Sequence, residues 1–528
     1  MFWGDRISNE VEKRYREVIK RGVPLVVRDE KTASGRVHVG SMRSAAMHGM
    51  VSEILAERGV KNFFRFEIND FDPMDGLPTY LDEKVYREHM GKPLYMIPAP
   101  DEKAKNYAEQ YAGEYLGVIE ESGFHPEVSR ASELYLSGRM NDVIRVALEQ
   151  AADIRRIYKE ASGSEKGDDW LPLNVICEKC GKLGTTKVTS FDGEKVAYSC
   201  EPNMVSWAAG CGHGGTVSPF DGNAKLPWKV DWAAKFVVYG VHFEGAGKDH
   251  FTKGGSRYVA DAISRDVFKH EPPYGVANEF FLVGGKKMSS SKGAGSSARE
   301  IADLLPPHIF RLALFGSDIG RQVNFDPEGD TIPVLFDRYD TIAGKFFSGI
   351  DDDDTRLFLL IHQANERREL KEVFLPRFSQ VAFLVQMPHM NLKEEINKLK
   401  GTPLTPADMN VLEERKRYAL EWLTKHASEE FKYELQEEVP ESAKKFSKGQ
   451  KEALQEIVRY IEQHEKLDGQ ELHTKLHEIR KSAGLEAKDF FGALYLSFLG
   501  KENGPKAGWF LSVLDRKLLE GRLQEVSR

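Results

Sequence analysis

The stretch at residues 282–297, LVGGKKMSSSKGAGSS, combines residue types that could bind a polyanion. It contains five serines, four glycines and three lysines. Glycine gives the backbone freedom to move, serine hydroxyls donate and accept hydrogen bonds, and lysine carries a point charge on a long stem. This composition predicts a loop that closes over phosphate groups, although a solvated Gly/Ser linker has a similar composition.

The four cysteines of the chain are a second group that could do chemistry. Cys177 and Cys180 form a CxxC pair, Cys200 and Cys211 follow, and all four lie within 35 residues. Such clustering favours a structural zinc site with four thiolate ligands at about residues 175–215. Ten residues separate Cys200 from Cys211, which is longer than usual, so His213 stays open as an alternative ligand. Four free buried cysteines that cluster by chance are the simpler alternative.

His38 is a third candidate, because it stands at the predicted start of a helix. A β-branched run at residues 23–29 predicts a buried parallel strand, and the next strand is expected at residues 62–70. The helix between them should end near Gly59, and its buried face is expected to be formed by Met47, Met50, Val51, Ile54 and Leu55. This order opens a nucleotide-binding α/β fold, in which the helix start binds phosphate or adenine. A lone histidine, however, is more often structural than catalytic.

Two motifs taken together change the interpretation of His38. HVGS after the first strand and KKMSSSKG about 250 residues later resemble the HIGH and KMSKS signatures of class I aminoacyl-tRNA synthetases. Further segments, including NDFDPMDGLP, KPLYMIPAPD and FFGALYLSFLGKENGP, extend the resemblance to the class I lysyl-tRNA synthetase family over residues 23–518. Two positions depart from the general signatures. Ser41 replaces the last histidine of HIGH, and Ser290 replaces the second lysine of KMSKS, with Lys292 two positions later.

The resemblance implies ATP-dependent activation of L-lysine and its transfer to lysine tRNA. The lysine carboxylate attacks the α-phosphorus of ATP and pyrophosphate leaves, so the protein must position the reactants and neutralise developing charge. His38, Lys287 and Lys292 are expected as catalytic residues, and Mg²⁺ is expected with ATP. The expected ATP contacts are Ser34, Gly35, His38, Gly40, Ser41, Lys287, Met288, Ser289, Ser290 and Ser291.

The lysine pocket is expected near residues 230–258. There KFVVYGVHFE (residues 235–244) predicts a strand and GAGKDH a loop at its carboxyl end, which is where open α/β sheets bind ligands. A lysine ε-ammonium needs a desolvated carboxylate, and aromatic rings add cation–π attraction. The candidates are Thr32, Asp231, Trp232, Asp249, His250, Glu279 and Phe280, with Trp228 as a further aromatic ring. Thr32 and His250 rest on the resemblance, and Asp249 and His250 are favoured.

These patterns predict an α/β fold with a Rossmann-type parallel-sheet catalytic domain, a zinc-bearing insertion and an all-α C-terminal domain. The expected boundaries are residues 1–70 and 228–297 for the two Rossmann halves, 71–227 for the insertion, 298–350 for a connector and 351–528 for the helical domain. The resemblance implies that the helical domain binds the anticodon. Lys501, Lys506 and Trp509 offer charge and stacking surface for RNA there, and a dimerisation bundle is the alternative.

Composition narrows the functional classes without deciding among them. The formal net charge of −8 argues against general coating of nucleic acid, but it allows a local basic face. No apolar run approaches the ~20 residues of a membrane span, and four cysteines in so long a chain fit a reducing cytoplasm. A glutamyl-type synthetase, a nucleotidylyltransferase and a catalytically idle synthetase-like RNA-binding protein remain alternatives. The oligomeric state stays open, with a monomer as the simpler expectation.

Overall fold

The computed structural model describes residues 1–528 except 102, 287, 289–294 and 388–389. The chain divides into two compact units. The first comprises Met1–Phe325 and Lys345–Leu370, and the second comprises Asp326–Gly344 and Lys371–Arg528.

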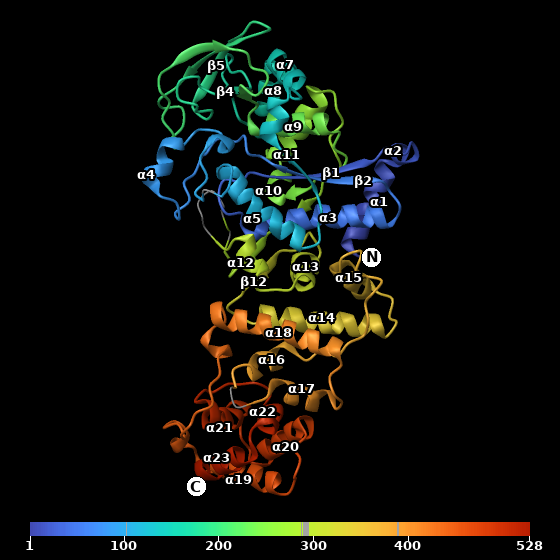
Figure 1. Ribbon diagram of the computed structural model, residues 1–528, viewed down its shortest axis with the longest axis vertical. Helices are drawn as coiled ribbons and strands as arrows, with labels where there is room; N and C mark the ends of the chain where they lie inside the picture. Colours follow the sequence, from blue (N-terminus) through green and yellow to red (C-terminus); the bar gives the residue numbers. More distant parts are fainter. Residues whose placement is uncertain (102, 287, 289–294, 388–389) are drawn as a thin grey trace. The chain divides into compact units, whose positions relative to one another are not determined.

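A parallel sheet forms the centre of the first unit (Figure 1). β1 (Leu25–Lys31) pairs with β2 (Asn62–Ile68), and β2 pairs with β3 (Glu127–Arg130). Two single-residue bridges extend the sheet on the other side of β1. Val27 of β1 pairs with Phe243, and Phe243 pairs with Tyr274, both in the parallel sense. The order is therefore β3, β2, β1, Phe243, Tyr274. The order reverses beside β1, and such a point is where ligands bind in open α/β sheets.

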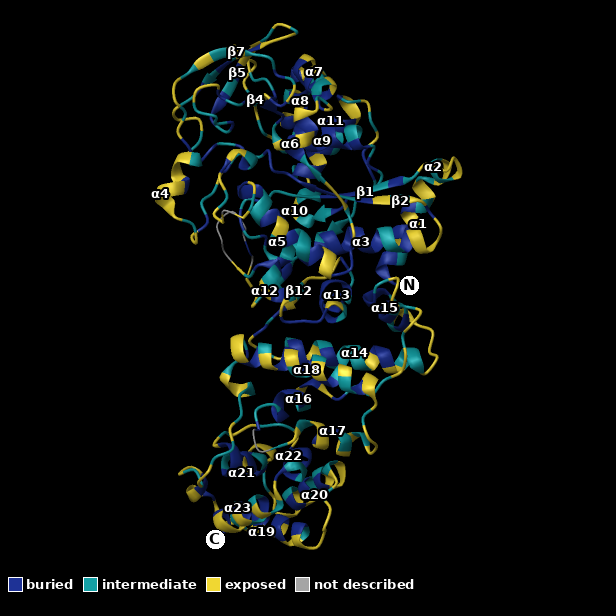
Figure 2. Cartoon of the chain, in the orientation of Figure 1, coloured by how far each residue is buried: buried dark blue, intermediate teal, exposed yellow. Residues whose placement is uncertain are grey.

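Helices cover both faces of this sheet (Figure 1). α3 (Met42–Glu57) packs on β1 and β2, and α5 (Tyr107–Glu121) lies on the same side. α9 (Trp228–Tyr239) and α11 (Ser256–Asp266) pack together on the opposite side. Most residues of α3 are buried (Figure 2), including the five apolar residues of its predicted face. The predicted strand, helix, strand opening of a Rossmann-type fold is confirmed.

The strand predicted at residues 235–244 is wrong for its first half. Residues up to Tyr239 belong to α9, which ends at Gly240 in the left-handed conformation (φ 61°). Only the residues around Phe243 join the sheet. A helix buried on most sides and a buried strand both present a near-continuous apolar run, so periodicity did not separate them.

The stretch assigned to an insertion, residues 71–227, contributes β3 to the parallel sheet. It also carries a separate antiparallel sheet of β5 (Thr186–Phe191), β6 (Val196–Cys200) and β7 (Gly214–Val217). β4 (Asn174–Val175), which precedes this sheet in the chain, pairs with β8 (Ala224–Lys225), which follows it. The exact domain boundaries stay a prediction.

The other elements of the first unit are mostly short. They are α1 (Trp3–Arg14), α2 (Arg16–Lys20), η1 (Val39–Ser41), α4 (Glu83–Tyr86), η2 (Arg87–His89), η3 (Leu94–Met96), α6 (Ala131–Leu136), α7 (Asn141–Glu149), α8 (Ala151–Ser162), β9 (Ala246–Gly247), α10 (Lys248–Phe251), β10 (Ala277–Asn278), β11 (Phe281–Val283), α12 (Ala298–Ala302), α13 (Pro307–Phe315), β12 (Val323–Phe325) and α15 (Asp353–Ile361).

All described elements of the second unit are helical, as predicted. They are most of α14 (Thr331–Phe347), α16 (Phe378–Leu384), α17 (Leu392–Lys400), α18 (Pro406–Lys425), η4 (Glu429–Phe431), η5 (Ala443–Lys445), α19 (Lys448–Glu462), α20 (Gly469–Ser482), α21 (Ala487–Leu499), α22 (Ala507–Val513) and α23 (Arg516–Val526). Across the described residues, no helix has both the length and the apolar character needed to cross a bilayer.

Candidate active site

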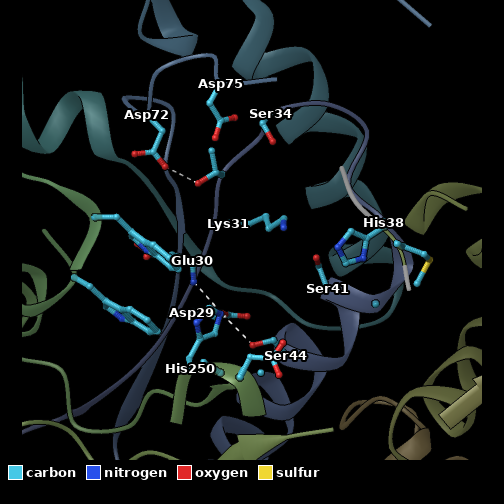
Figure 3. A pocket seen from close by; sticks show the side chains of 18 of the residues that line it. Asp29, Glu30, Lys31, Ser34, His38, Ser41, Ser44, Asp72, Asp75 and His250 are labelled. Atoms are coloured by element: carbon cyan, nitrogen blue, oxygen red, sulfur yellow. Dashed lines mark hydrogen bonds between the residues drawn. The ribbon is translucent and has the colours of Figure 1, made fainter. Parts of the chain in front are cut away.

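A cavity of about 920 Å³ opens at the carboxyl end of β1, where the strand order reverses. It lies entirely within the first unit. Its walls come from the end of β1, from η1, and from residues 244–247, 249–250 and 278–282. Met204, Val205 and Trp207 also line it, and they belong to residues 177–211, here called the cysteine-bearing part. In Figure 3, His38 and Ser41 lie on one side of this cavity, and Asp72 and Asp75 lie together on another.

The first signature segment pairs with the residues that directly follow the second one, beside this cavity. The Val39 N–H donates to the Ser296 carbonyl at 3.2 Å, and the Ala298 N–H donates to the Val37 carbonyl at 2.8 Å. Gly40 allows a further close approach, because a Cβ there would lie 3.1 Å from the Phe281 carbonyl oxygen. Segments more than 240 residues apart in the sequence are thus held together beside the cavity.

The predicted ATP contacts divide into three groups. Ser34, His38, Gly40, Ser41 and Met288 line the cavity, and Gly35 is not among its lining residues. The predicted contacts that lie outside the described residues are Lys287, Ser289, Ser290, Ser291 and Lys292.

His38 is held neutral in the folded protein. Burial, together with the positive charge of Lys31, lowers the pKa of His38 to about 3. A neutral imidazole can donate one hydrogen bond, and a phosphate oxygen can accept it. Lys31 was missed in the sequence, although its side chain runs toward His38 (Figure 3). The one available signal was its position at the carboxyl end of a strand.

Asp231 does not line the cavity, so its predicted contact with lysine is wrong. It is 1% exposed, accepts a hydrogen bond from the Tyr135 hydroxyl at 2.5 Å, and pairs with Lys225 at 3.0 Å and Lys235 at 2.9 Å. Burial by itself would raise the pKa of Asp231, but the positive charges of Lys225 and Lys235 lower this pKa below the usual range. This carboxylate is already paired inside the protein.

Asp231 belongs to a larger cluster, here called the buried charge network. The network joins five carboxylates to three cations, and its members are Arg28, Glu30, Glu67, Asp72, Lys225, Asp231, Lys235 and Glu244. Four of them, Glu30, Asp72, Lys225 and Glu244, also line the cavity. The excess of carboxylates favours a cation at this wall.

Glu244 is a member of the network that the sequence did not reveal. It is 2% exposed and accepts two hydrogen bonds from the Arg28 guanidinium, at 3.0 and 2.8 Å. The Trp232 indole N–H also donates to it at 2.5 Å. Burial raises the pKa of Glu244, and the Arg28 charge opposes that rise. Glu244 therefore fixes the orientation of a predicted pocket ring.

Aromatic rings form a corner next to Glu244. Trp228 and Trp232 stack with centroids 5.9 Å apart, and His250 contacts both edge-on at 5.5 and 5.6 Å. All three rings line the cavity. Such a corner can cover an aliphatic chain and attract a cation.

The remaining predicted lysine contacts, Thr32, Asp249, Glu279 and Phe280, also line the cavity. Glu279 pairs with Lys248 at 2.9 Å, and the Lys248 amino group lies 5.1 Å from the Phe280 ring centroid. The Thr32 hydroxyl donates to Asp72 at 2.7 Å. Asp249 is exposed at the rim.

The four cysteines come together as predicted. Their sulfur atoms all lie within 4.8 Å of one another, and the Cys177–Cys211 and Cys180–Cys200 pairs are each 3.7 Å apart. Four Zn–S bonds of about 2.3 Å in a tetrahedron require about 3.8 Å between sulfurs, so the arrangement fits a tetrahedral metal. The Cys211 N–H donates to the Cys200 sulfur at 3.3 Å. His213 is not part of this cluster among the described residues, and its carbonyl accepts from the Cys200 N–H.

Comparison with known proteins agrees with this architecture. The profile of the family described as tRNA synthetases class I (K) matches residues 1–371, and that of an anticodon binding domain matches residues 384–527. The chain belongs to the class I tRNA synthetases. Three relatives, all named lysine–tRNA ligase, are each 30% identical to it. The Methanosarcina barkeri (strain Fusaro) protein aligns over 99% of this chain and 97% of its own length, that of Archaeoglobus fulgidus over 99% of both, and that of Methanocaldococcus jannaschii over 98% of both.

In the helical unit of this synthetase, Trp509 is not an RNA-stacking surface. It is 5% exposed, and its ring packs edge-on against Phe383 with centroids 5.4 Å apart. The Lys501 amino group donates to the carbonyls of Glu429 and Lys432. Lys506 is exposed and donates to the Gln470 side chain at 2.6 Å. The prediction for Trp509 is wrong, while Lys506 stays a predicted contact.

Proposed function

We propose that this synthetase is a lysine–tRNA ligase. It activates L-lysine with ATP to lysyl-adenylate, releases pyrophosphate, and transfers lysine to the 3′-terminal adenosine of lysine tRNA. The observation that carries this proposal is the pairing of residues 37–39 with residues 296–298 beside a cavity whose far wall has excess negative charge.

The phosphate side of the cavity positions ATP. Neutral His38 donates a hydrogen bond to a phosphate oxygen, and Lys31 beside it offers positive charge as the carboxylate attacks the α-phosphorus. Lys287 and Lys292 act as the further clamp on the leaving pyrophosphate. Mg²⁺, when bound with ATP, supplies the remaining positive charge.

The opposite side selects lysine. The aliphatic chain of the substrate lies along Trp232 and His250, and its ε-ammonium faces Glu30 and Glu244. Because these carboxylates are already oriented by Arg28 and Trp232, the site needs little reorganisation to bind a cation. Thr32 and Asp72 extend the polar wall.

The cysteine cluster fits one structural Zn²⁺, with Cys177, Cys180, Cys200 and Cys211 as its ligands. The metal would join the ends of the loops between these cysteines and so stabilise the small sheet of β5, β6 and β7. The helical unit, which matches an anticodon binding domain, would contact the tRNA, with Lys506 as one contact.

A glutamyl-type enzyme is the nearest alternative. A carboxylate substrate requires an unpaired cation, usually arginine, in the amino-acid pocket. No arginine lies among the described residues that line the cavity. The family match and the length of the chain argue against a short nucleotidylyltransferase.

ATP–pyrophosphate exchange tests the proposal directly. The full-length protein is assayed with each of the twenty amino acids, with and without lysine tRNA, because activation can depend on bound tRNA. We expect exchange with lysine and with none of the other nineteen amino acids. Exchange driven by glutamate, or by no amino acid even with tRNA present, would overturn the assignment.

A further inference from the structure

The segment between Cys200 and Cys211, residues 201–210, is a loop closed at its base. The Gly210 N–H donates to the Glu201 carbonyl at 3.2 Å, and the Gly212 N–H donates to the Cys200 carbonyl at 2.9 Å. Both flanking residues are members of the cysteine cluster. The position of the loop ends is therefore set by the cluster and by β6.

The far part of this loop reaches the substrate cavity. Met204, Val205 and Trp207 line the same cavity as His38 and Glu244. Leu183 and Gly184, which lie between Cys180 and Cys200 in the sequence, line it too. Two of the segments that separate the cysteines are thus part of the cavity wall.

Trp207 attaches the loop to its surroundings. A Cβ on Gly184 would lie 2.3 Å from the Trp207 ring and 3.3 Å from Pro73, so only glycine leaves room for the indole. The Lys182 amino group donates to the Ala209 carbonyl at 2.9 Å. The N–H groups of Leu183 and Gly184 both donate to the Gly91 carbonyl, at 2.7 and 3.1 Å. The ring is therefore held between the cysteine-bearing part and the segment that carries Asp72 and Asp75.

The loop presents apolar atoms where a substrate would cover them. Met204 is 43% exposed although it lines the cavity. Asn203 and Ser206, its neighbours in the same loop, are exposed and do not line the cavity. Apolar surface at the mouth of a binding cavity gains free energy when a ligand removes it from water.

We infer that the loop at residues 201–210 contacts bound lysyl-adenylate as part of the cavity wall, and that Trp207 holds this loop in position. Closing the cysteine cluster around its metal sets the wall, so metal occupancy controls the affinity of the site for lysyl-adenylate as well as the stability of the small sheet. This inference rests on the proposed function.

Binding of a non-hydrolysable lysyl-adenylate analogue, a lysyl-sulfamoyl adenosine, to the full-length protein tests the wall by calorimetry. Trp207→Ala and the double variant Met204→Ala, Val205→Ala should each raise the dissociation constant about tenfold, while the zinc content and the circular dichroism spectrum at the assay temperature stay at the wild-type values. Trp207→Tyr, which keeps a flat ring on Gly184, should restore most of the affinity. Asn203→Ala and Ser206→Ala are matched controls in the same loop and should bind as the wild type does.

The metal is tested separately by stripping zinc from the wild type with a chelator. Amide hydrogen exchange of residues 201–210 should speed up and analogue affinity should fall together, and added Zn²⁺ should reverse both. Unchanged analogue affinity in Trp207→Ala and in stripped protein would overturn the inference. If the untreated wild type does not bind the analogue at all, the proposed function fails instead.

Discussion

The two sides of the substrate cavity achieve opposite polarity by different means. On the phosphate side the chain presents a neutral histidine, His38, and one described cation, Lys31. On the lysine side, carboxylates are held in place by Arg28, Lys225 and Lys235 inside the buried charge network. In the proposed assignment, the site for the lysine ammonium is thus part of the folded core, whereas ATP and its metal would complete the phosphate site.

This difference separates the expected effects of substitutions. A change in the buried charge network removes one of the partners of a charge in a low-dielectric interior, which costs folding free energy. A change on the phosphate side removes a contact made mainly in the transition state, which costs rate.

The largest effect is expected for Glu244→Ala. The substitution removes the acceptor of two Arg28 hydrogen bonds and of the Trp232 indole N–H, and these donors remain buried. The free energy of unfolding should fall by about 3–5 kcal/mol, measured by urea denaturation followed by circular dichroism. Glu271→Ala is the control, because the Glu271 side chain is 70% exposed and its ion pair with Arg14 should contribute less than about 1 kcal/mol. Equal losses in the two variants would contradict the distinction between core and surface charge.

A smaller effect, on rate alone, is expected for His38→Ala. Losing the hydrogen bond to a phosphate oxygen should raise the activation barrier by about 2–4 kcal/mol with little change in unfolding, and Lys287→Ala should behave alike. Rapid-quench measurement of adenylate formation detects the loss. His125→Ala, at a histidine 64% exposed, should have no effect. Activation within about threefold of the wild type in His38→Ala would show that His38 has no such role.

The pH dependence of stability tests whether the folded protein holds His38 neutral. Burial and the Lys31 charge keep the pKa of His38 at about 3 in the folded protein, while in the unfolded chain this histidine titrates at ~6.5. Because the folded pKa is lowered, the stability that neutral His38 allows is fully present above pH ~6.5. It is lost as the pH falls toward the folded pKa, since the unfolded chain then binds a proton that the folded protein does not. Relative to His38→Gln, the wild type should lose about 1 kcal/mol of unfolding free energy for each pH unit below ~6. Denaturation at several pH values measures this, and parallel curves for the two proteins would mean that His38 is not held neutral.

Local patterns in the sequence predicted the parts of the site that depend on local structure. The apolar spacing predicted the α3 helix shortly after His38, and cysteine clustering predicted that the four sulfur atoms come together, because helical periodicity and ligand spacing are properties of neighbouring residues. Asp231 shows the limit. It lies in the right part of the chain, but α9 turns it into the buried charge network rather than into the cavity.

Residues that act through tertiary contacts had no local signal. Glu244 becomes important only because Arg28, about 200 positions earlier in the chain, pairs with it. Trp509 was predicted to be exposed beside lysines, but Phe383 covers one edge of its ring. Burial of this kind is set by packing between helices far apart in the sequence, and a single sequence does not specify it.

The smallest effect is expected in the helical unit and should leave both sides of the cavity unchanged. Because Trp509 is buried, the test uses the exposed Lys506 alone. Lys506→Glu should raise the Michaelis constant for lysine tRNA about threefold to tenfold and lower the salt dependence of tRNA binding by about one unit of slope, since one phosphate contact is lost. Lys448→Glu is the matched control, because it reverses a charge on the exposed start of α19. Pyrophosphate exchange should stay at the wild-type level in both variants, measured without tRNA if the wild type activates lysine alone. If Lys506→Glu charges limiting tRNA as the wild type does, the RNA contacts lie elsewhere in this unit, and an effect on exchange would instead mean that the two units are coupled in activation.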